Sequence, residues 1–122
     1  MNNFKMTEIE QFFNAPDYDD DNLINSEFFG VIYSLGRDAE NDEEYRYALN
    51  LLLSLCDRKS QRVRTRAIIA ISLLAIKHKR LERERVEPII IREWEIADDE
   101  NKATIRDAID DINNAMKWNM AV

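Results

Sequence analysis

The chain has 122 residues, a length that suits one domain, and its formal net charge is −7. Only 2 glycines and 2 prolines occur, which disfavours a fold built from many tight turns, so we expect long helices joined by short polar links. The single cysteine excludes an internal disulfide framework. It is compatible with a reducing cytoplasm, and no segment approaches the roughly 20 apolar residues of a membrane span, so a cytoplasmic location is expected.

Apolar residues at helical spacing predict two helices in the first third of the chain. The first is expected from Thr7 to Asn14, where Thr7 and Glu10 have the spacing of a capping box. The second is expected to begin after an acidic loop, with Asp21 or Asn22 as its cap, and to run to about Leu35. Gly36 is a natural stop for this second helix, because glycine is the preferred residue just beyond a helix end.

Four further helices follow. The third is expected over 43–55, and Ser60 is expected to cap a fourth that reaches Lys79. The fourth is apolar nearly all round, so we place it at the centre of the fold. Pro88 is expected in the first turn of the fifth helix, where its missing N–H costs nothing, and the sixth is expected over 102–118.

Two stretches of the chain repeat each other at an offset of 42 residues. The aligned pairs are Asp57 with Asp99, Val63 with Ile105, Arg64 with Arg106, Ala67 with Ile109 and Ala70 with Ile112. Internal periods of about 40–47 residues with two helices per unit are typical of HEAT and armadillo repeats. The repeat therefore predicts an architecture that mostly binds other proteins, and it names no chemistry.

The first copy, with an aspartate before the turn and Val63-Arg64 opening the second helix, resembles a HEAT repeat over about residues 43–118. The second copy is a weaker match, because Ile109 replaces the small residue Ala67. The resemblance implies an all-α fold, a short HEAT/armadillo-like stack of about three antiparallel helix pairs. The expected division of this single 1–122 domain is a divergent N-terminal capping unit and two HEAT-like pairs, over 1–42, 43–80 and 86–119.

The resemblance also implies a structural role for the repeated aspartate and arginine, which join neighbouring turns. The residues concerned are Asp57, Arg64, Asp99 and Arg106. A physical reason exists independently of the family, since arginines near a helix N-terminus are disfavoured by the helix dipole. The two aspartates are candidates to compensate for that charge, by capping or by pairing.

Patterns for metal binding or catalysis fail on inspection. Asp17, Asp19 and Asp21 have the spacing of a calcium loop, but Asn22 stands where the turn needs glycine and Phe28 where a bidentate glutamate is needed. The only histidine, His78, offers no zinc spacing and is expected at the surface near a helix end. Nothing indicates that Glu93 or Glu95 is desolvated, as a general acid would be. We therefore expect neither an enzyme nor a metal or cofactor site.

Acidic residues interleaved with tyrosines occur in two links. Acids attract a basic partner and aromatic side chains fill its pockets, which is how a tight inhibitor engages its target. Plain solvation and helix capping explain the same acids without any partner, and that alternative stays open. The candidate partner-binding residues are Asp17, Tyr18, Asp19, Asp20, Asp21, Asp38, Glu40, Asp42, Glu43, Glu44, Tyr45 and Tyr47.

Charge changes sign twice along the chain. The net charge is −10 over 1–57, +8 over 58–85 and −5 over 86–122. A nucleic-acid binder concentrates positive charge overall, and the basic segment 58–85 holds no aromatic residue to stack on bases. Acidic faces instead suit a protein that steers a basic partner.

The leading interpretation is a cytoplasmic protein-binding inhibitor. In size, acidity and helical form the chain is similar to immunity proteins of bacterial toxin systems, including contact-dependent growth inhibition. These proteins neutralise basic toxin domains, often nucleases, by covering the active site. Two alternatives remain: a scaffold or adaptor that holds a peptide or partner protein, and a nucleic-acid-binding helical repeat that uses segment 58–85.

Overall fold

The computed structural model describes residues 4, 6–13 and 26–121, and it is all-helical over these residues, as the sequence predicts. Six helices occupy them and no strand is present among them. The helices are α1 (Met6–Phe13), α2 (Ser26–Asp38), α3 (Asp42–Leu55), α4 (Gln61–His78), α5 (Arg83–Ile96) and α6 (Asp99–Met116). None of these helices is both long enough and apolar enough to cross a membrane.

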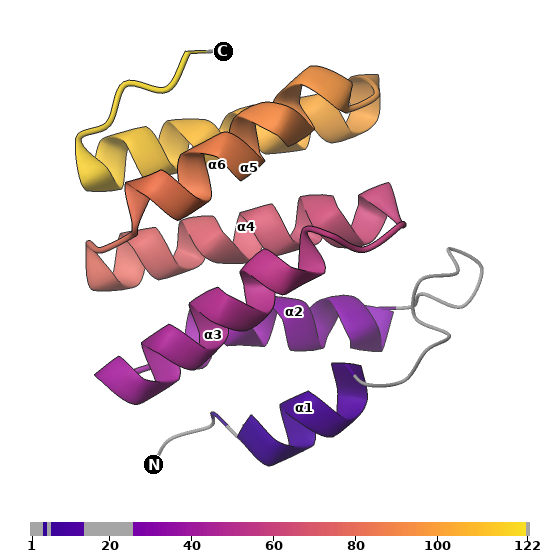
Figure 1. Cartoon of the computed structure of the whole chain (residues 1–122), viewed down its shortest axis with the longest axis vertical. Helices are drawn as coiled ribbons and strands as arrows, with labels where there is room; N and C mark the ends of the chain where they lie inside the picture. Colours follow the sequence, from indigo (N-terminus) through magenta and orange to yellow (C-terminus); the bar gives the residue numbers. More distant parts are fainter. Residues whose placement is uncertain (1–3, 5, 14–25, 122) are drawn as a thin grey trace.

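Helix α4 is the centre of the arrangement. Figure 1 shows α2, α4 and α6 side by side in one row, with α3 and α5 crossing in front of it. Helix α4 contacts four other helices, α2, α3, α5 and α6. This position confirms the expectation drawn from its apolar character, because a helix covered on several sides has no polar face to show to water.

Side-chain caps fix the start of three helices. Asn41 accepts a hydrogen bond from the Glu44 N–H at 2.9 Å, and Ser60 accepts one from the Val63 N–H at 3.3 Å, as predicted for Ser60. Asp98 caps α6 by accepting from the Asn101 N–H at 2.9 Å, so this helix begins three residues before the predicted start. That backbone hydrogen bond lowers the pKa of Asp98.

The predicted stop at Gly36 is wrong, because α2 continues through it to Asp38. Gly36 serves close packing instead. A Cβ built on Gly36 would overlap the carbonyl oxygen of Ala70 and would lie 3.0 Å from the Cβ of Leu73. Absence of a side chain therefore lets α2 approach the backbone of α4. The predicted start of this helix, near Asp21, lies outside the described residues.

The predicted position of Pro88 is also wrong. Helix α5 begins at Arg83, so Pro88 lies in its second turn and one backbone hydrogen bond is missing there. The first turn carries no apolar periodicity that would reveal it. An ion pair between Arg83 Nε and Glu87 Oε2 at 2.7 Å spans this turn instead. Pairs at this spacing support a helix where apolar packing does not.

One cluster of buried hydrophobic side chains runs from Phe4 to Met120 and joins all six helices. The small residues Ala67 and Ala70 of the repeat are fully buried on α4, which agrees with their expected role in close packing. Cys56, just beyond the end of α3, belongs to the same cluster. The core thus extends along the row instead of gathering at one end.

Replacing Gly36 with alanine is expected to lower the free energy of unfolding by about 1–3 kcal/mol, because the added methyl group overpacks the α2–α4 contact. Gly30 is the matched control in the same helix, since nothing lies within 4 Å of its built Cβ. There the same substitution should raise stability by about 0.5–1 kcal/mol through helix propensity. Urea unfolding followed by circular dichroism measures both. Equal effects of the two substitutions would disprove the close approach.

Candidate functional site

Five of the twelve predicted partner-binding residues, Asp17 to Asp21 with Tyr18 among them, lie outside the described residues. Among the described acids, Asp38 and Asp42 already have basic partners. Asp38 accepts from Arg37 Nε at 2.9 Å, and this hydrogen bond lowers the pKa of Asp38. Asp42 pairs with Arg46 at 3.0 Å and with Arg80, whose hydrogen bond lowers the pKa of Asp42.

Of the three predicted glutamates, one caps a helix and two have exposed side chains. Glu44 is buried and its Oε1 accepts from the Glu40 N–H at 2.8 Å, which closes the first turn of α3. Glu40 and Glu43 have exposed side chains. Three of the described acids, Asp38, Asp42 and Glu44, therefore serve in ion pairs or helix capping. This is the alternative that the sequence left open.

The two described tyrosines of the predicted site are used inside the fold. Tyr45 is only 2% exposed, and its hydroxyl donates to the Arg80 carbonyl at 3.0 Å. Tyr47 is half-buried, and its hydroxyl donates to the Met6 carbonyl at 3.2 Å. Burial raises the pKa of both hydroxyls. Tyr45 is thus a core residue, and the expectation that it serves as an exposed anchor is corrected.

His78 is half-buried, which corrects its expected surface position. Its ring centroid lies 5.1 Å from that of Tyr45, and its Nε2 lies 2.9 Å from the carbonyl oxygen of Ala39. The histidine thereby links the end of α4 to the segment between α2 and α3.

The repeated arginine Arg64 has a structural role, but its partner is not the repeated aspartate. Its Nε donates to Glu93 Oε1 at 2.8 Å, and Glu93 is only 1% exposed. Arg92 Nε lies 3.1 Å from the other oxygen of Glu93, Oε2. Asp57 has only a long contact, 3.9 Å, with Arg92. A buried carboxylate is thus held between two guanidinium groups.

Arg64 also donates to two carbonyls of the link between α3 and α4, those of Arg58 at 2.9 Å and Lys59 at 2.7 Å. Arg92 donates to the carbonyl of Cys56 at 2.7 Å. The Glu93 cluster therefore ties α4 and α5 to the end of α3. Glu93 is therefore desolvated, contrary to the interpretation of the sequence, which missed one signal: Glu93 shares a helical face with the apolar residues Val86 and Ile90.

The second copy of the repeat is used differently. Asp99 stands in the first turn of α6 but is not its cap, since Asp98 takes that place. Arg106 lies over the ring of Trp94, 5.6 Å from its centroid, together with Lys102 at 4.8 Å. The expected pairing of the repeated aspartate with the repeated arginine is therefore corrected in both copies.

A hollow of about 480 Å³ lies at this place, between α5 and α6. Its lining residues are Trp94, Asp99, Lys102, Ala103, Arg106 and Asp107. Two carboxylates, two cations and one half-exposed indole thus share one recess. Trp94 was not among the predicted partner-binding residues, although its position between Glu93 and Glu95 in a charged helix could have drawn attention to it.

The outer face of α6 is acidic. Four exposed carboxylates fall on one helical arc, and none of them makes an ion pair with a described residue. They are Glu100, Asp107, Asp110 and Asp111. Two physical costs attach to the last three: Asp107 repels Asp110 and Asp111 at i, i+3 and i, i+4, and the acids at 110 and 111 lie in the second half of the helix, where they oppose its dipole. The last turn of α6 holds no basic residue that would offset this.

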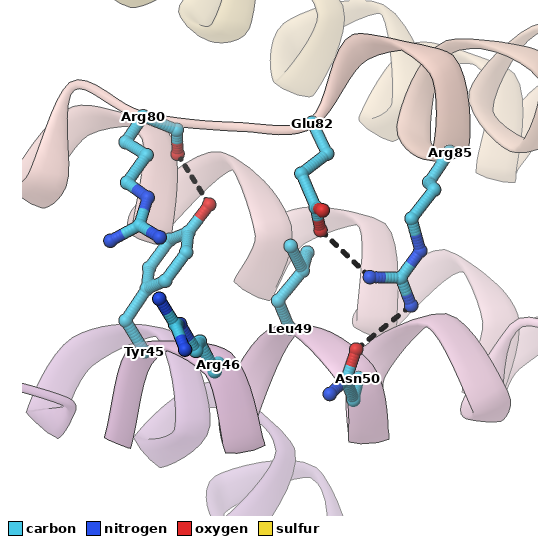
Figure 2. Close-up of a pocket in the computed structure, with 7 residues that line it drawn as sticks. All are labelled: Tyr45, Arg46, Leu49, Asn50, Arg80, Glu82 and Arg85. Atoms are coloured by element: carbon cyan, nitrogen blue, oxygen red, sulfur yellow. Dashed lines mark hydrogen bonds and ion pairs between the residues drawn. The ribbon is translucent and has the colours of Figure 1, made fainter. Parts of the chain in front are cut away.

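Figure 2 shows a second recess, a pocket of about 340 Å³ between α3 and the link from α4 to α5. Its lining residues are Tyr45, Arg46, Leu49, Asn50, Arg80, Glu82 and Arg85. Three guanidinium groups and one carboxylate dominate its surface. Asp42, which pairs with Arg46 and Arg80, stands beside it.

Among the residues that the structure describes, no three histidine, cysteine, aspartate or glutamate side chains gather closely enough to hold a metal ion. Cys56 is fully buried, and its burial raises the pKa of the thiol to about 12. A thiol with this pKa is almost entirely protonated near neutral pH and is a poor nucleophile.

Comparison with known proteins gives no relative. No family model, curated protein or solved structure matches the chain.

Replacing Glu93 with glutamine is expected to lower the free energy of unfolding by about 3 kcal/mol, because Arg64 and Arg92 would lose their buried counter-charge. Glu95→Gln is the matched control: the same change, two residues away, at an exposed position. It should alter stability by no more than about 0.5 kcal/mol. Urea unfolding of both variants measures the difference. A Glu93→Gln protein as stable as the wild type would contradict the role given to this cluster.

The thiol of Cys56 is expected to react with Ellman's reagent only when the chain unfolds, because it is buried and protonated. The labelling rate at neutral pH should therefore rise with urea in parallel with the unfolded fraction measured by circular dichroism. Rapid, stoichiometric labelling of the folded protein would contradict this burial.

Proposed function

We propose that the chain is a short HEAT-like stack of three antiparallel helix pairs, α1 with α2, α3 with α4 and α5 with α6. Contacts at the helix ends support the second and third of these pairs. Tyr45, near the start of α3, bonds to the carbonyl of Arg80 beyond the end of α4. Arg83, which opens α5, donates to Asn119 Oδ1 beyond the end of α6 at 2.9 Å.

The order within the row supports the same architecture. Gln61 Oε1 accepts from Asn101 Nδ2 at 3.0 Å, which brings the first turns of α4 and α6 together. Lys77 Nζ donates to the carbonyl of Arg37 at 3.0 Å, which joins the last turns of α2 and α4. Neighbouring helices of the row therefore run in the same direction, as the second helices of stacked helical hairpins do.

We propose further that the protein is an inhibitor that binds a basic protein through the outer face of α6. The observation that carries this proposal is the arc of four exposed carboxylates defined above, which make no ion pair with a described residue. Because the repulsion among Asp107, Asp110 and Asp111 opposes folding, a contribution to function accounts for these three better than one to stability. An acidic surface of this kind accelerates association with a basic protein.

The hollow at Trp94 supplies an anchor beside the acidic face. Asp107 belongs to both, so a basic side chain of the partner that pairs with Asp107 would enter the recess that Trp94 lines. Tryptophan is enriched among the residues that dominate interface energies, because a large apolar ring leaves water on binding. Attraction by the arc and burial of Trp94 are thus the two steps of the proposed mechanism.

The partner proposed is a toxin domain of the basic, nuclease type, neutralised in the cytoplasm by an immunity protein that covers its active site. Support comes from the chain's 122 residues, its net charge of −7 and its helical form, which are similar to those of immunity proteins. Coverage of a cationic active site by carboxylates also excludes the substrate phosphates that this site attracts.

A specific observation favours the scaffold alternative. Ile69, Leu73 and Ile76 recur at helical spacing on α4, and Ile76 is 43% exposed although it belongs to the central helix. An apolar stripe of this kind suits the docking of a peptide or partner helix. Binding there would depend little on salt, whereas binding at the α6 face would weaken steeply with ionic strength.

The nucleic-acid alternative has less support, because arginines of segment 58–85 have partners within the fold. Arg64 pairs with Glu93, Arg83 with Glu87 and Arg85 with Glu82. Arg66 lies 5.2 Å from the ring centroid of Phe29.

The decisive experiment is a pull-down with the tagged protein from a lysate of its source at low salt, followed by mass spectrometry. We expect recovery of one basic, nuclease-like polypeptide that high salt releases. A triple variant, Asp107→Asn with Asp110→Asn and Asp111→Asn, should reduce the association rate with this polypeptide roughly tenfold or more, because steering is lost.

The matched control removes the same number of charges elsewhere, by Glu10→Gln, Glu84→Gln and Glu95→Gln at exposed positions. This variant should bind at close to the wild-type rate. If both variants lost the same fraction of the association rate, net charge alone would explain the effect. The assignment of the binding face to α6 would then be overturned. Recovery of an acidic or neutral partner that high salt does not release would favour the scaffold.

A further inference from the structure

We propose that the pocket in Figure 2 is a binding site for a phosphoryl group, a doubly charged tetrahedral oxyanion. The site is independent of the proposed inhibitor function, since none of its lining residues belongs to α6. Three elements contribute a guanidinium to it: α3 through Arg46, the link after α4 through Arg80 and α5 through Arg85. They approach the pocket from different sides in Figure 2.

The lining is positively charged in a protein that is acidic overall. Three guanidinium groups line the pocket with one carboxylate, that of Glu82, and Asp42 beside it pairs with Arg46 and Arg80. One positive charge is therefore in excess at this place, while the whole chain has a net charge of −7. Guanidinium is the side-chain group best suited to phosphate, because its planar fork donates several N–H groups to oxygen atoms. A concentration of three in one recess of an acidic chain therefore indicates an anionic ligand.

Two of the three arginines, Arg80 and Arg85, are held in position by contacts within the fold. Arg85 donates to Glu82 Oε2 at 2.7 Å and to Asn50 Oδ1 at 2.8 Å, which uses two of its five N–H groups. Arg80 bonds to Asp42 and lies over the ring of Tyr45, 4.4 Å from its centroid. These contacts fix the guanidinium planes before a ligand arrives, so little side-chain entropy is lost on binding.

The first turn of α5 is a second, independent indication. Its N-cap residue, Glu82, makes no side-chain bond to the amides of that turn, whereas Asn41, Ser60 and Asp98 cap α3, α4 and α6. Uncapped amides and the positive end of the helix dipole favour an anion. Because Glu82 and Arg85 both line the pocket, this helix start adjoins it.

The geometry favours a phosphoryl group over a carboxylate. A carboxylate presents two oxygens in one plane and is satisfied by a single guanidinium fork, as Asp38 is by Arg37. The guanidinium groups of Arg46, Arg80 and Arg85 come from three different parts of the fold, and they suit a tetrahedral anion with several oxygen atoms better. Tyr45 and Leu49, both almost fully buried, form an apolar part of the wall that suits a small organic substituent on the phosphate.

The test is a titration of the folded protein with inorganic phosphate at constant ionic strength, followed by NMR of the arginine Nε–H signals. We expect saturable shifts for Arg46, Arg80 and Arg85 in the millimolar range. Arg85→Gln should weaken binding roughly tenfold, because it removes charge-assisted hydrogen bonds. Glu82→Gln should strengthen binding roughly threefold, because it removes the opposing carboxylate.

Lys59→Gln is the matched control, since it removes the same charge at an exposed position outside the pocket. It should leave the affinity within about twofold of the wild type. Arg46→Gln provides a second pocket variant, because Arg46 is well exposed and its ion pair lies within α3. Unchanged thermal unfolding would show that the pocket variants remain folded.

Shifts that do not saturate, or equal weakening by Lys59→Gln and Arg85→Gln, would overturn the proposal. Acetate should not compete at the same concentration, and competition as strong as that of phosphate would also overturn it. Comparison with a phosphoserine peptide then identifies the source of the group. Tighter binding of the peptide assigns the site to a phosphorylated protein, and equal binding assigns it to a free phosphate or phosphate ester.

Discussion

The carboxylate of Glu93 is almost completely removed from water, and a charge at such depth is tolerated only while cations neutralise it. Arg64 from α4 and Arg92 from α5 do so, and both also bond to carbonyls at the end of α3 and in the link that follows. If α3, α4 or α5 moved relative to the other two, the cluster would separate and the buried charge of Glu93 would lose a partner. One ion-pair cluster thereby fixes the relative position of α3, α4 and α5, on which the pocket of Figure 2 depends.

Much of the fold could be predicted from local patterns. Apolar periodicity located the helices, the capping chemistry of Ser60 set the start of α4, and its all-round apolar character placed α4 in the centre. Errors arose where another force replaced the expected one. Gly36 meets a neighbouring backbone and does not end its helix, and the first turn of α5 is held by charge pairs that leave no apolar pattern. The first cause is a tertiary contact and the second is an ion pair. Neither can be predicted from the periodicity of hydrophobic residues.

The candidate site was less predictable, because function depends on which charges remain unpaired. Asp42 looks like a free acid in the sequence, yet Arg80, which neutralises it, is 38 positions away. The burial of Tyr45 could have been predicted, because Tyr45 has helical spacing with Leu49 and Leu52, which are also buried. Acids on α6 could have been weighed more heavily, as their repulsion at i, i+4 is visible without a structure. The arginines of the pocket converge from three elements, which no local pattern indicates.

The negative charge on α6 also affects whether further copies of the chain can extend the row of helices α2, α4 and α6. A row of helices is open at its last member, and a second copy of the chain could in principle continue it and start a filament. The helices at the other end of the row, α1 and α2, have a net charge of −3 between them, and they would face the carboxylates of α6. Like charges at both ends make head-to-tail polymerisation unfavourable. The acids of α6 thus oppose lengthening of the row by a second copy of the chain.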